Sequence, residues 1–168
     1  ILNQARLSSR QPSHIDSVLN SVPNVNFSAG ASRGRFIQIR GIGERSQFAE
    51  PINPSVSFIV DEFDFSGLAA AGLIFDTQQL DVYRGPQATL YGTGALAGAV
   101  KLSSNKVGSE SPKYVEARLG SKDSYRVEAA AGDDINTDWG YRVALVHNRS
   151  DGFVENTYLN RDDTNNID

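Results

Sequence analysis

Three acidic residues, Asp61, Glu62 and Asp64, form the group of side chains best suited to covalent chemistry in this sequence. A pair of carboxylates can serve as the acid and the base of glycoside hydrolysis. The cluster directly follows the apolar run Val56–Val60, which reads as a strand, so it also has the composition of the turn after that strand. We favour the turn, and a hydrolase is the weakest of the function classes considered.

Other patterns that could bind a nucleotide or a metal each lack a necessary part. Gly92–Ala97 fits a loose G-x-G-x-x-A pattern, but a helical turn precedes it and a strand follows, the reverse of a dinucleotide site. His14 and His147 have no metal-ligand spacing. An acidic run near the C-terminus lacks the glycine and the closing glutamate of a calcium-binding EF-hand loop; its members are Asp162, Asp163, Asn165, Asn166 and Asp168. We therefore expect no cofactor and no bound metal.

The run Leu80–Val100 predicts a strand, one helical turn, a glycine-rich bend and a second strand. Arg84 places a permanent charge at the end of the first strand. Gly85 permits a sharp change of direction, and Pro86 suits the first position of a helix, where no N–H is needed. The glycines that follow either end the helical turn or permit close backbone approach; they are Gly92, Gly94 and Gly98.

The composition excludes several classes of protein. The chain has 168 residues, a formal net charge of -4 and 21% charged residues, which argues against a general nucleic-acid binder. Cysteine is absent, so no disulfide forms. No apolar run reaches roughly 18 residues, so the sequence predicts no transmembrane helix.

The first half mixes short helices with short strands. Ile15, Val18, Leu19 and Val22 form the apolar stripe of an amphipathic helix that Pro23 ends. Apolar segments then predict strands; they lie around Val25 and Phe27, at Phe36–Arg40, which Gly41 closes, and at Val56–Val60. This half is expected to be a small α+β module.

Residues 103–112 are polar and rich in turn formers, and the pattern changes after them. The segments 113–120, 124–132 and 139–149 alternate between apolar and polar residues, which predicts antiparallel strands. Each has about the nine to eleven residues of a tilted membrane-spanning strand, and Trp139 and Tyr141 suit an interfacial aromatic girdle. The periodicity alone more often indicates a soluble antiparallel sheet with one solvent-exposed face.

Four segments in order resemble the plug domain and first barrel strands of a TonB-dependent outer-membrane receptor: Ile15–Val25, Ile37–Gly43, Pro54–Glu62 and Leu80–Lys106. The resemblance implies an α+β plug, a small mixed sheet with short helices, followed by antiparallel strands of a truncated outer-membrane β-barrel. The plug would cover 1–107 without its N-terminal part, a linker 108–112, and the first three barrel strands with the start of an extracellular loop 113–168. A complete barrel has about 22 strands, so a fragment is expected.

The resemblance also implies a function. Such receptors take up a scarce nutrient, with a ferric siderophore as the first choice, across the outer membrane of a Gram-negative bacterium, and they are not enzymes. The plug faces the periplasm and gates the barrel. The expected partners are TonB, through an N-terminal box absent from this chain, the receptor's own barrel, outer-membrane lipid and the nutrient, but no nucleic acid. The alternative is a soluble periplasmic binding module with a plug-like fold.

Individual residues take roles from the same resemblance. Arg40 and Arg84 match the two plug arginines that pair with barrel glutamates and so latch the plug. Ligand contacts are expected at two apices. In the first, Arg45 would pair with an anionic siderophore, Gln47 would hydrogen-bond it and Phe48 would stack on it. The second apex contains Asp64 and Phe65.

Overall fold

The computed structural model describes residues 1–3, 7, 15–28, 36–44, 54–66, 74–121, 123–149, 154–156 and 161–164. The chain forms two compact units, Ile1–Ser104 and Asn105–Asp168. Among the described residues, no helix has the length and apolar character needed to cross a membrane. The predicted limits of the plug, linker and strand regions stay predictions.

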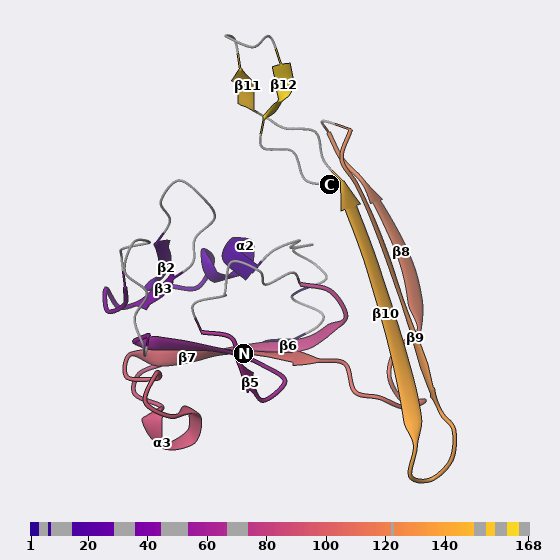
Figure 1. Cartoon of the computed structure of the whole chain (residues 1–168), viewed down its shortest axis with the longest axis horizontal. Coiled ribbons are helices and arrows are strands. Elements are labelled where there is room, and N and C mark those ends of the chain that lie inside the picture. The colour runs from indigo at the N-terminus through magenta and orange to yellow at the C-terminus, as the bar shows by residue number, and fades with distance from the viewer. Residues whose placement is uncertain are drawn as a thin grey trace. The chain divides into compact units, whose positions relative to one another are not determined.

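A five-stranded mixed sheet organises the N-terminal unit, with strand order β1-β6-β7-β4-β5 (Figure 1). Strands β4 and β7 are parallel and the other neighbouring pairs are antiparallel. At the sheet's edge, Leu2 pairs with Leu80 and Asn3 with Gln79. The strands span Leu2–Asn3 (β1), Val56–Val60 (β4), Phe63–Asp64 (β5), Thr77–Arg84 (β6) and Gly98–Ser104 (β7).

Helix α2 (Ile15–Leu19) and the hairpin of β2 (Val25–Ser28) and β3 (Phe36–Ile39) lie on one side of this sheet (Figure 1). Ile15, Val18 and Leu19 of the helical stripe are fully buried and pack into one apolar core with both the hairpin and the sheet. Burying each such side chain contributes about 1.5–3 kcal/mol. The helix ends at Leu19, before the last residue of the predicted stripe, yet Val22 still packs against the core.

Between β6 and β7 the chain makes the helical turn α3 (Ala88–Tyr91). Its N-cap is Gln87, so Pro86 precedes the cap instead of taking the first helical position that the sequence predicts for it. Gly92 caps the C-terminal end with φ 78°, a value that favours glycine.

Gly98 begins β7 at a point with no room for a side chain. A Cβ atom at this position would lie 2.2 Å from the carbonyl oxygen of Tyr83 and 2.7 Å from Cδ1 of Ile39. The absence of a side chain therefore lets the ends of β3, β6 and β7 meet.

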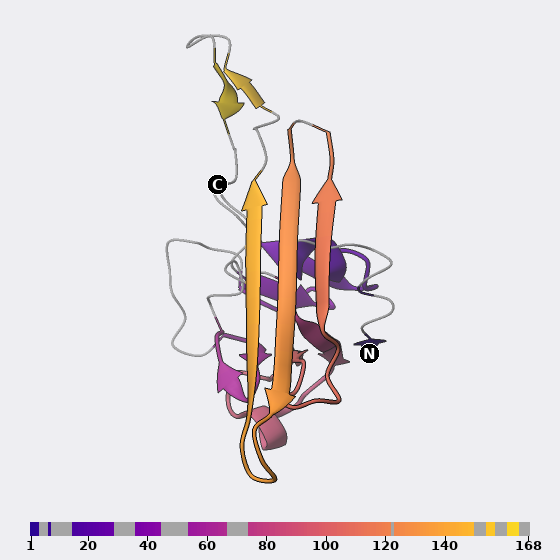
Figure 2. The ribbon, with the colours of Figure 1, turned by 90° about the vertical axis from the view of Figure 1, so that its right-hand side faces the viewer.

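The C-terminal unit contains a three-stranded antiparallel sheet of order β10-β9-β8 (Figure 2). Its strands are β8 (Tyr114–Leu119), β9 (Tyr125–Asp134) and β10 (Gly140–Arg149), and each end lies within two residues of the predicted segment. The pairing runs without a register shift. A small hairpin of β11 (Val154–Asn156) and β12 (Arg161–Thr164) follows. A mixed sheet with short helices followed by antiparallel strands confirms the predicted fold class.

Candidate functional site

Two arginines that are distant in the sequence meet at the turn between α2 and β2. Nη1 of Arg84 donates a hydrogen bond to the carbonyl oxygen of Pro23 at 3.3 Å. The backbone N–H of Arg40 donates to the carbonyl oxygen of Asn24 at 2.8 Å. One short turn therefore holds both arginines at the same end of the N-terminal unit.

The backbone around this turn is unusual. Arg40 has φ 55° and Asn24 has φ 62°, both in the left-handed region. An L-residue other than glycine spends about 1–2 kcal/mol there, so the surrounding contacts must hold Arg40 in place. Gly41 follows with φ 79° and open space where its Cβ would be.

Both guanidinium groups face outward. Arg40 and Arg84 are exposed, and among the described residues neither makes an ion pair. A guanidinium stays charged and offers a planar fork that fits a carboxylate through two hydrogen bonds. The arrangement can therefore bind carboxylates supplied from outside this unit.

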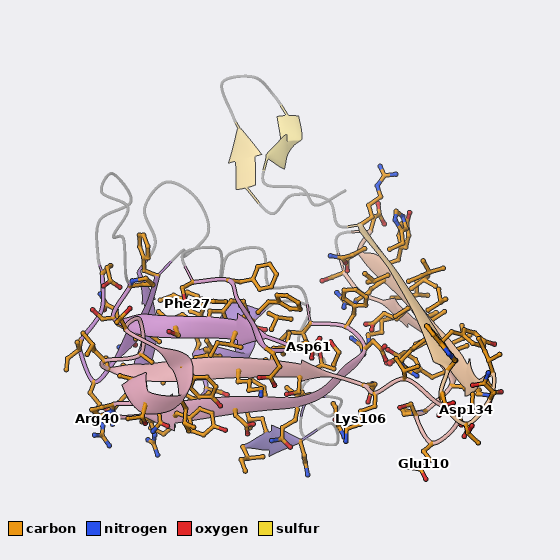
Figure 3. All side chains as sticks on the ribbon, turned by 60° about the horizontal axis from the view of Figure 1, so that its bottom comes forward. Phe27, Arg40, Asp61, Lys106, Glu110 and Asp134 are labelled. Atoms are coloured by element: carbon orange, nitrogen blue, oxygen red, sulfur yellow. The ribbon has the colours of Figure 1, made fainter. Side chains whose placement is uncertain are left out.

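The acidic cluster lies at the other end of the sheet, as Figure 3 shows by the positions of Arg40 and Asp61. The Asp61 carboxylate accepts hydrogen bonds from the backbone N–H and the hydroxyl of Ser104, at 2.8 and 2.5 Å. Lys101 donates to Glu62 at 2.5 Å, and this bond raises the pKa of Lys101.

Asp64 accepts hydrogen bonds from the backbone N–H of Ser66, at 2.8 Å, and from its hydroxyl. Every carboxylate of the cluster thus has a local donor, and Asp61 and Glu62 both have positive φ. No group of histidine and acidic side chains able to hold a metal occurs in the described part of the chain. This geometry supports the reading of the cluster as a turn.

The predicted ligand residues fall into two groups. Arg45, Gln47 and Phe48 lie outside the described residues. Phe65 belongs to the second predicted apex: its side chain is exposed, and its backbone N–H donates to the carbonyl oxygen of Phe58 at 2.7 Å. Of the two histidines, His14 is outside the described residues, whereas Nε2 of His147 lies 3.1 Å from the hydroxyl of Tyr125.

The β8–β10 sheet has its apolar side chains on the exposed face. Leu119, Val115 and Leu145 are 88, 80 and 67% exposed, although the residue that precedes each of them is partly buried. The large apolar side chains of this face come from all three strands; they are Val115, Leu119, Val127, Tyr141, Val143 and Leu145. The sequence predicts the alternation, but it does not say which face lies outside.

The opposite face of the sheet carries a network of charges. Arg118 binds Glu116 through two hydrogen bonds, of 2.7 and 3.0 Å, and lies 3.3 Å from Glu128. Arg126 and Glu128 are both buried and form an ion pair at 2.5 Å. Sequence reasoning missed this network. Its signal was present, because each of the two neighbouring segments carries a glutamate and an arginine two positions apart, which places both on one face of a strand.

Comparison with known families finds one that covers most of the chain. Residues 1–99 match the family model described as the TonB-dependent receptor plug domain. The pesticin receptors of Yersinia enterocolitica and Yersinia pestis are 28% identical to this chain over 150 residues, which is 88% of it. The chain spans only 22% of the length of these curated relatives.

Solved structures show the same fold. The ferric yersiniabactin uptake receptor FyuA from Yersinia pestis superposes with a TM-score of 0.83 and 26% identity, over 98% of this chain and 26% of that receptor. The ferric-catecholate import receptor Fiu from E. coli K12 gives a TM-score of 0.64 and 20% identity, over 89% of this chain and 21% of its own. This second likeness bears on the fold alone.

Proposed function

Because the chain belongs to the TonB-dependent receptor plug domain family, we propose that it is the plug and first barrel strands of a receptor that imports a ferric siderophore across an outer membrane. The family consists of transport receptors and not of enzymes. The siderophore is proposed because a similar structure is that of a ferric yersiniabactin uptake receptor. The curated relatives are named pesticin receptors, so pesticin is the other ligand that these similarities suggest.

The two faces of the β8–β10 sheet carry the proposal. Membrane-spanning barrels turn apolar side chains toward lipid and polar ones toward the lumen. Here Val115, Leu119 and Leu145 are exposed while Arg126 and Glu128 are buried. A soluble module, the alternative, would leave this apolar face in water, where large exposed apolar patches are uncommon. Strands β9 and β10 have ten residues each, which is the length of a tilted spanning strand.

The N-terminal unit would close the barrel lumen. Arg40 and Arg84 would bind carboxylates on the barrel wall, and these ion pairs would hold the plug until energy delivered through TonB loosens it. Removing one partner of a buried ion pair costs about 3–5 kcal/mol. The latch is therefore strong enough to keep the plug seated and weak enough to be broken by force.

Ligand recognition would take place on outward-facing loops of the plug. Arg45 would neutralise an anionic ferric siderophore, Gln47 would donate a hydrogen bond, and Phe48 would stack on a planar part of the ligand. Phe65 offers a second aromatic contact, because it is exposed beside the β4–β5 hairpin. Asp64 would act indirectly, because its carboxylate already holds Ser66.

An uptake experiment tests the proposal. The gene for the full-length receptor is deleted, and the uptake of radioactive iron is measured with a panel of purified ferric siderophores under iron limitation. We expect uptake of one siderophore to be lost, to return with the wild-type gene, and to require TonB. Arg45→Ala combined with Phe48→Ala should weaken binding of that siderophore by about tenfold or more, whereas the exposed Lys106→Ala should not. Unchanged uptake of every siderophore after deletion would exclude the proposed substrate class.

A further inference from the structure

The exposed face of the β8–β10 sheet is hollowed along its middle strand. Ala129 and Ala131 on β9 lie between larger side chains of the two neighbouring strands: Val115 and Leu145 pair with Ala129, and Val143 pairs with Ala131. The resulting hollow has a volume of about 460 Å³ and an almost wholly apolar lining. Ligand sites have volumes of about 300–1,000 Å³.

One end of the hollow has a charged rim. Nζ of Lys113, which lines the hollow, lies 2.6 Å from Oδ2 of Asp133, and both side chains are about half exposed. Tyr141 pairs with Asp133 in the sheet, and the nearby Trp139 is 71% exposed. The groove therefore ends at a cation and its paired anion, with an exposed tyrosine opposite the anion and an exposed tryptophan two residues before that tyrosine in the sequence. Tyrosine and tryptophan concentrate at the level of lipid headgroups.

We propose that this hollow binds a zwitterionic glycerophospholipid. An acyl chain lies over Ala129 and Ala131, the phosphate contacts Lys113, and the headgroup ammonium contacts Asp133. The inference rests on the proposed function, which places this face against lipid. The charges support a zwitterionic headgroup because the rim offers one positive and one negative group rather than a basic cluster.

The topology assigns the lipid to one leaflet. Barrels have short periplasmic turns and longer extracellular loops. The segment after β10 is long enough to contain the hairpin of β11 and β12, so it lies outside the cell. The short turn between β9 and β10 then lies on the periplasmic side, together with Lys113 and Asp133. The bound phospholipid therefore belongs to the periplasmic leaflet.

Filling the hollow tests the acyl-chain contact. The full-length receptor is purified in mild detergent, loaded with phosphatidylethanolamine and analysed by native mass spectrometry. Ala131→Leu should lower retention of this lipid by about fivefold, because packing rather than water exclusion holds lipid to a membrane protein. The matched control is Ala117→Leu, which adds the same atoms to the exposed face of β8 outside the hollow. Equal retention by wild type and Ala131→Leu would overturn the inference.

Changing the rim tests the headgroup contact without touching the core of the sheet. Lys113→Gln should lower retention of phosphatidylethanolamine by about fivefold, as expected for one cation beside a lipid phosphate. Asp133→Asn should remove the preference for phosphatidylethanolamine over phosphatidylglycerol. A wild-type receptor that retains both lipids equally, or that carries a second receptor copy on this face, would contradict the assignment.

The same preparations separate this inference from the proposed function. If the wild-type receptor is found in the outer membrane and imports its siderophore while Ala131→Leu binds lipid normally, only the phospholipid site is wrong. If the wild-type receptor is absent from the outer membrane, the proposed function fails first.

Discussion

At the scale of single residues, the placement of Arg40 and Arg84 is the feature that most needs an explanation. Arg40 is held at φ 55°, which is an unfavourable backbone conformation, and Arg84 is hydrogen-bonded to Pro23. The fold therefore accepts local strain in order to place two exposed cations together. A solvated surface arginine needs neither constraint. The arrangement suits a preformed carboxylate receptor, in which little side-chain freedom remains to be lost on binding.

Removing both arginines should therefore loosen the plug in the full-length receptor. In Arg40→Ala combined with Arg84→Ala, we expect the amides of β6 and β7 to exchange hydrogen much faster, since each broken pair is worth about 3–5 kcal/mol if its partner is buried. Hydrogen exchange read by mass spectrometry measures this. Lys106→Ala, which removes another exposed cation, is the control. Exchange as slow as in the wild-type plug would show that the arginines do not latch it.

Much of the region around Arg84 could be predicted from the sequence because its signals are local. Glycine and proline determine which backbone conformations are favourable within a few residues. The strand, the helical turn and the bend of Leu80–Val100 could therefore all be predicted from the sequence. The helix begins later than predicted because Gln87 takes the cap, so Pro86 lies before the cap and not at the first helical position. The meeting of Arg40 with Arg84 at Pro23–Asn24 could not be predicted, because it depends on tertiary packing of distant segments.

At the scale of elements, the pairing of β8 with β9 sets like charges opposite each other. Glu116 faces Glu128, and Arg118 faces Arg126. Like charges in directly opposed positions destabilise a sheet, and here the ion pairs from Arg118 to Glu128 and from Arg126 to Glu128 offset that cost. Glu128 is the carboxylate that both arginines share.

Glu128→Gln should accordingly destabilise the sheet much more than Glu116→Gln. The first change leaves two facing guanidinium groups without their common anion, at a cost of about 3–5 kcal/mol. The second removes a partly exposed carboxylate and should cost under about 1 kcal/mol. Unfolding by guanidinium chloride in detergent micelles measures the free energy of unfolding of each variant receptor. Equal losses of unfolding free energy would mean that Glu128 is not the centre of the network.

The strands of this sheet were predictable, but their orientation was not. A period of two residues predicts a strand with two unlike faces, and the segments around Val115, Val127 and Val143 all show it. Whether the apolar face contacts protein or lipid depends on what surrounds the sheet. The two-residue period contains no information about those surroundings. The parallel pairing of β4 with β7 is likewise a long-range choice between segments that share only their apolar character.

At the scale of the whole molecule, the two units obey opposite rules of burial. The N-terminal unit buries most of its large apolar side chains in a main core around α2, β4 and β6, and a smaller cluster forms around Ile59 and Ala99. The C-terminal sheet exposes its apolar side chains and buries charges. Each rule suits one environment, so a protein that contains both should work where an aqueous space meets a lipid phase.

A charge on the exposed face should therefore block membrane insertion. Leu145 lies near the middle of β10, where arginine would cost about 2–4 kcal/mol at the bilayer midplane. We expect Leu145→Arg to lower the fraction of receptor recovered in the outer membrane. Asn148→Arg, on the opposite face of the same strand, should insert normally. Fractionation of cells that produce each variant makes the comparison, and normal insertion of Leu145→Arg would argue against a lipid-facing sheet.

The pairing of β1 with β6 has a consequence for the time course of synthesis. Leu2 is made well before its partner Leu80, and β4 must wait for its parallel partner β7. Long-range pairings of this kind form slowly, because the entropy of closing a large loop is lost before the contacts between its ends can stabilise it. The N-terminal sheet therefore cannot assemble strand by strand behind the ribosome. A chain that delays its own folding in this way stays extended for longer, which is the condition in which an exported protein is threaded through a membrane.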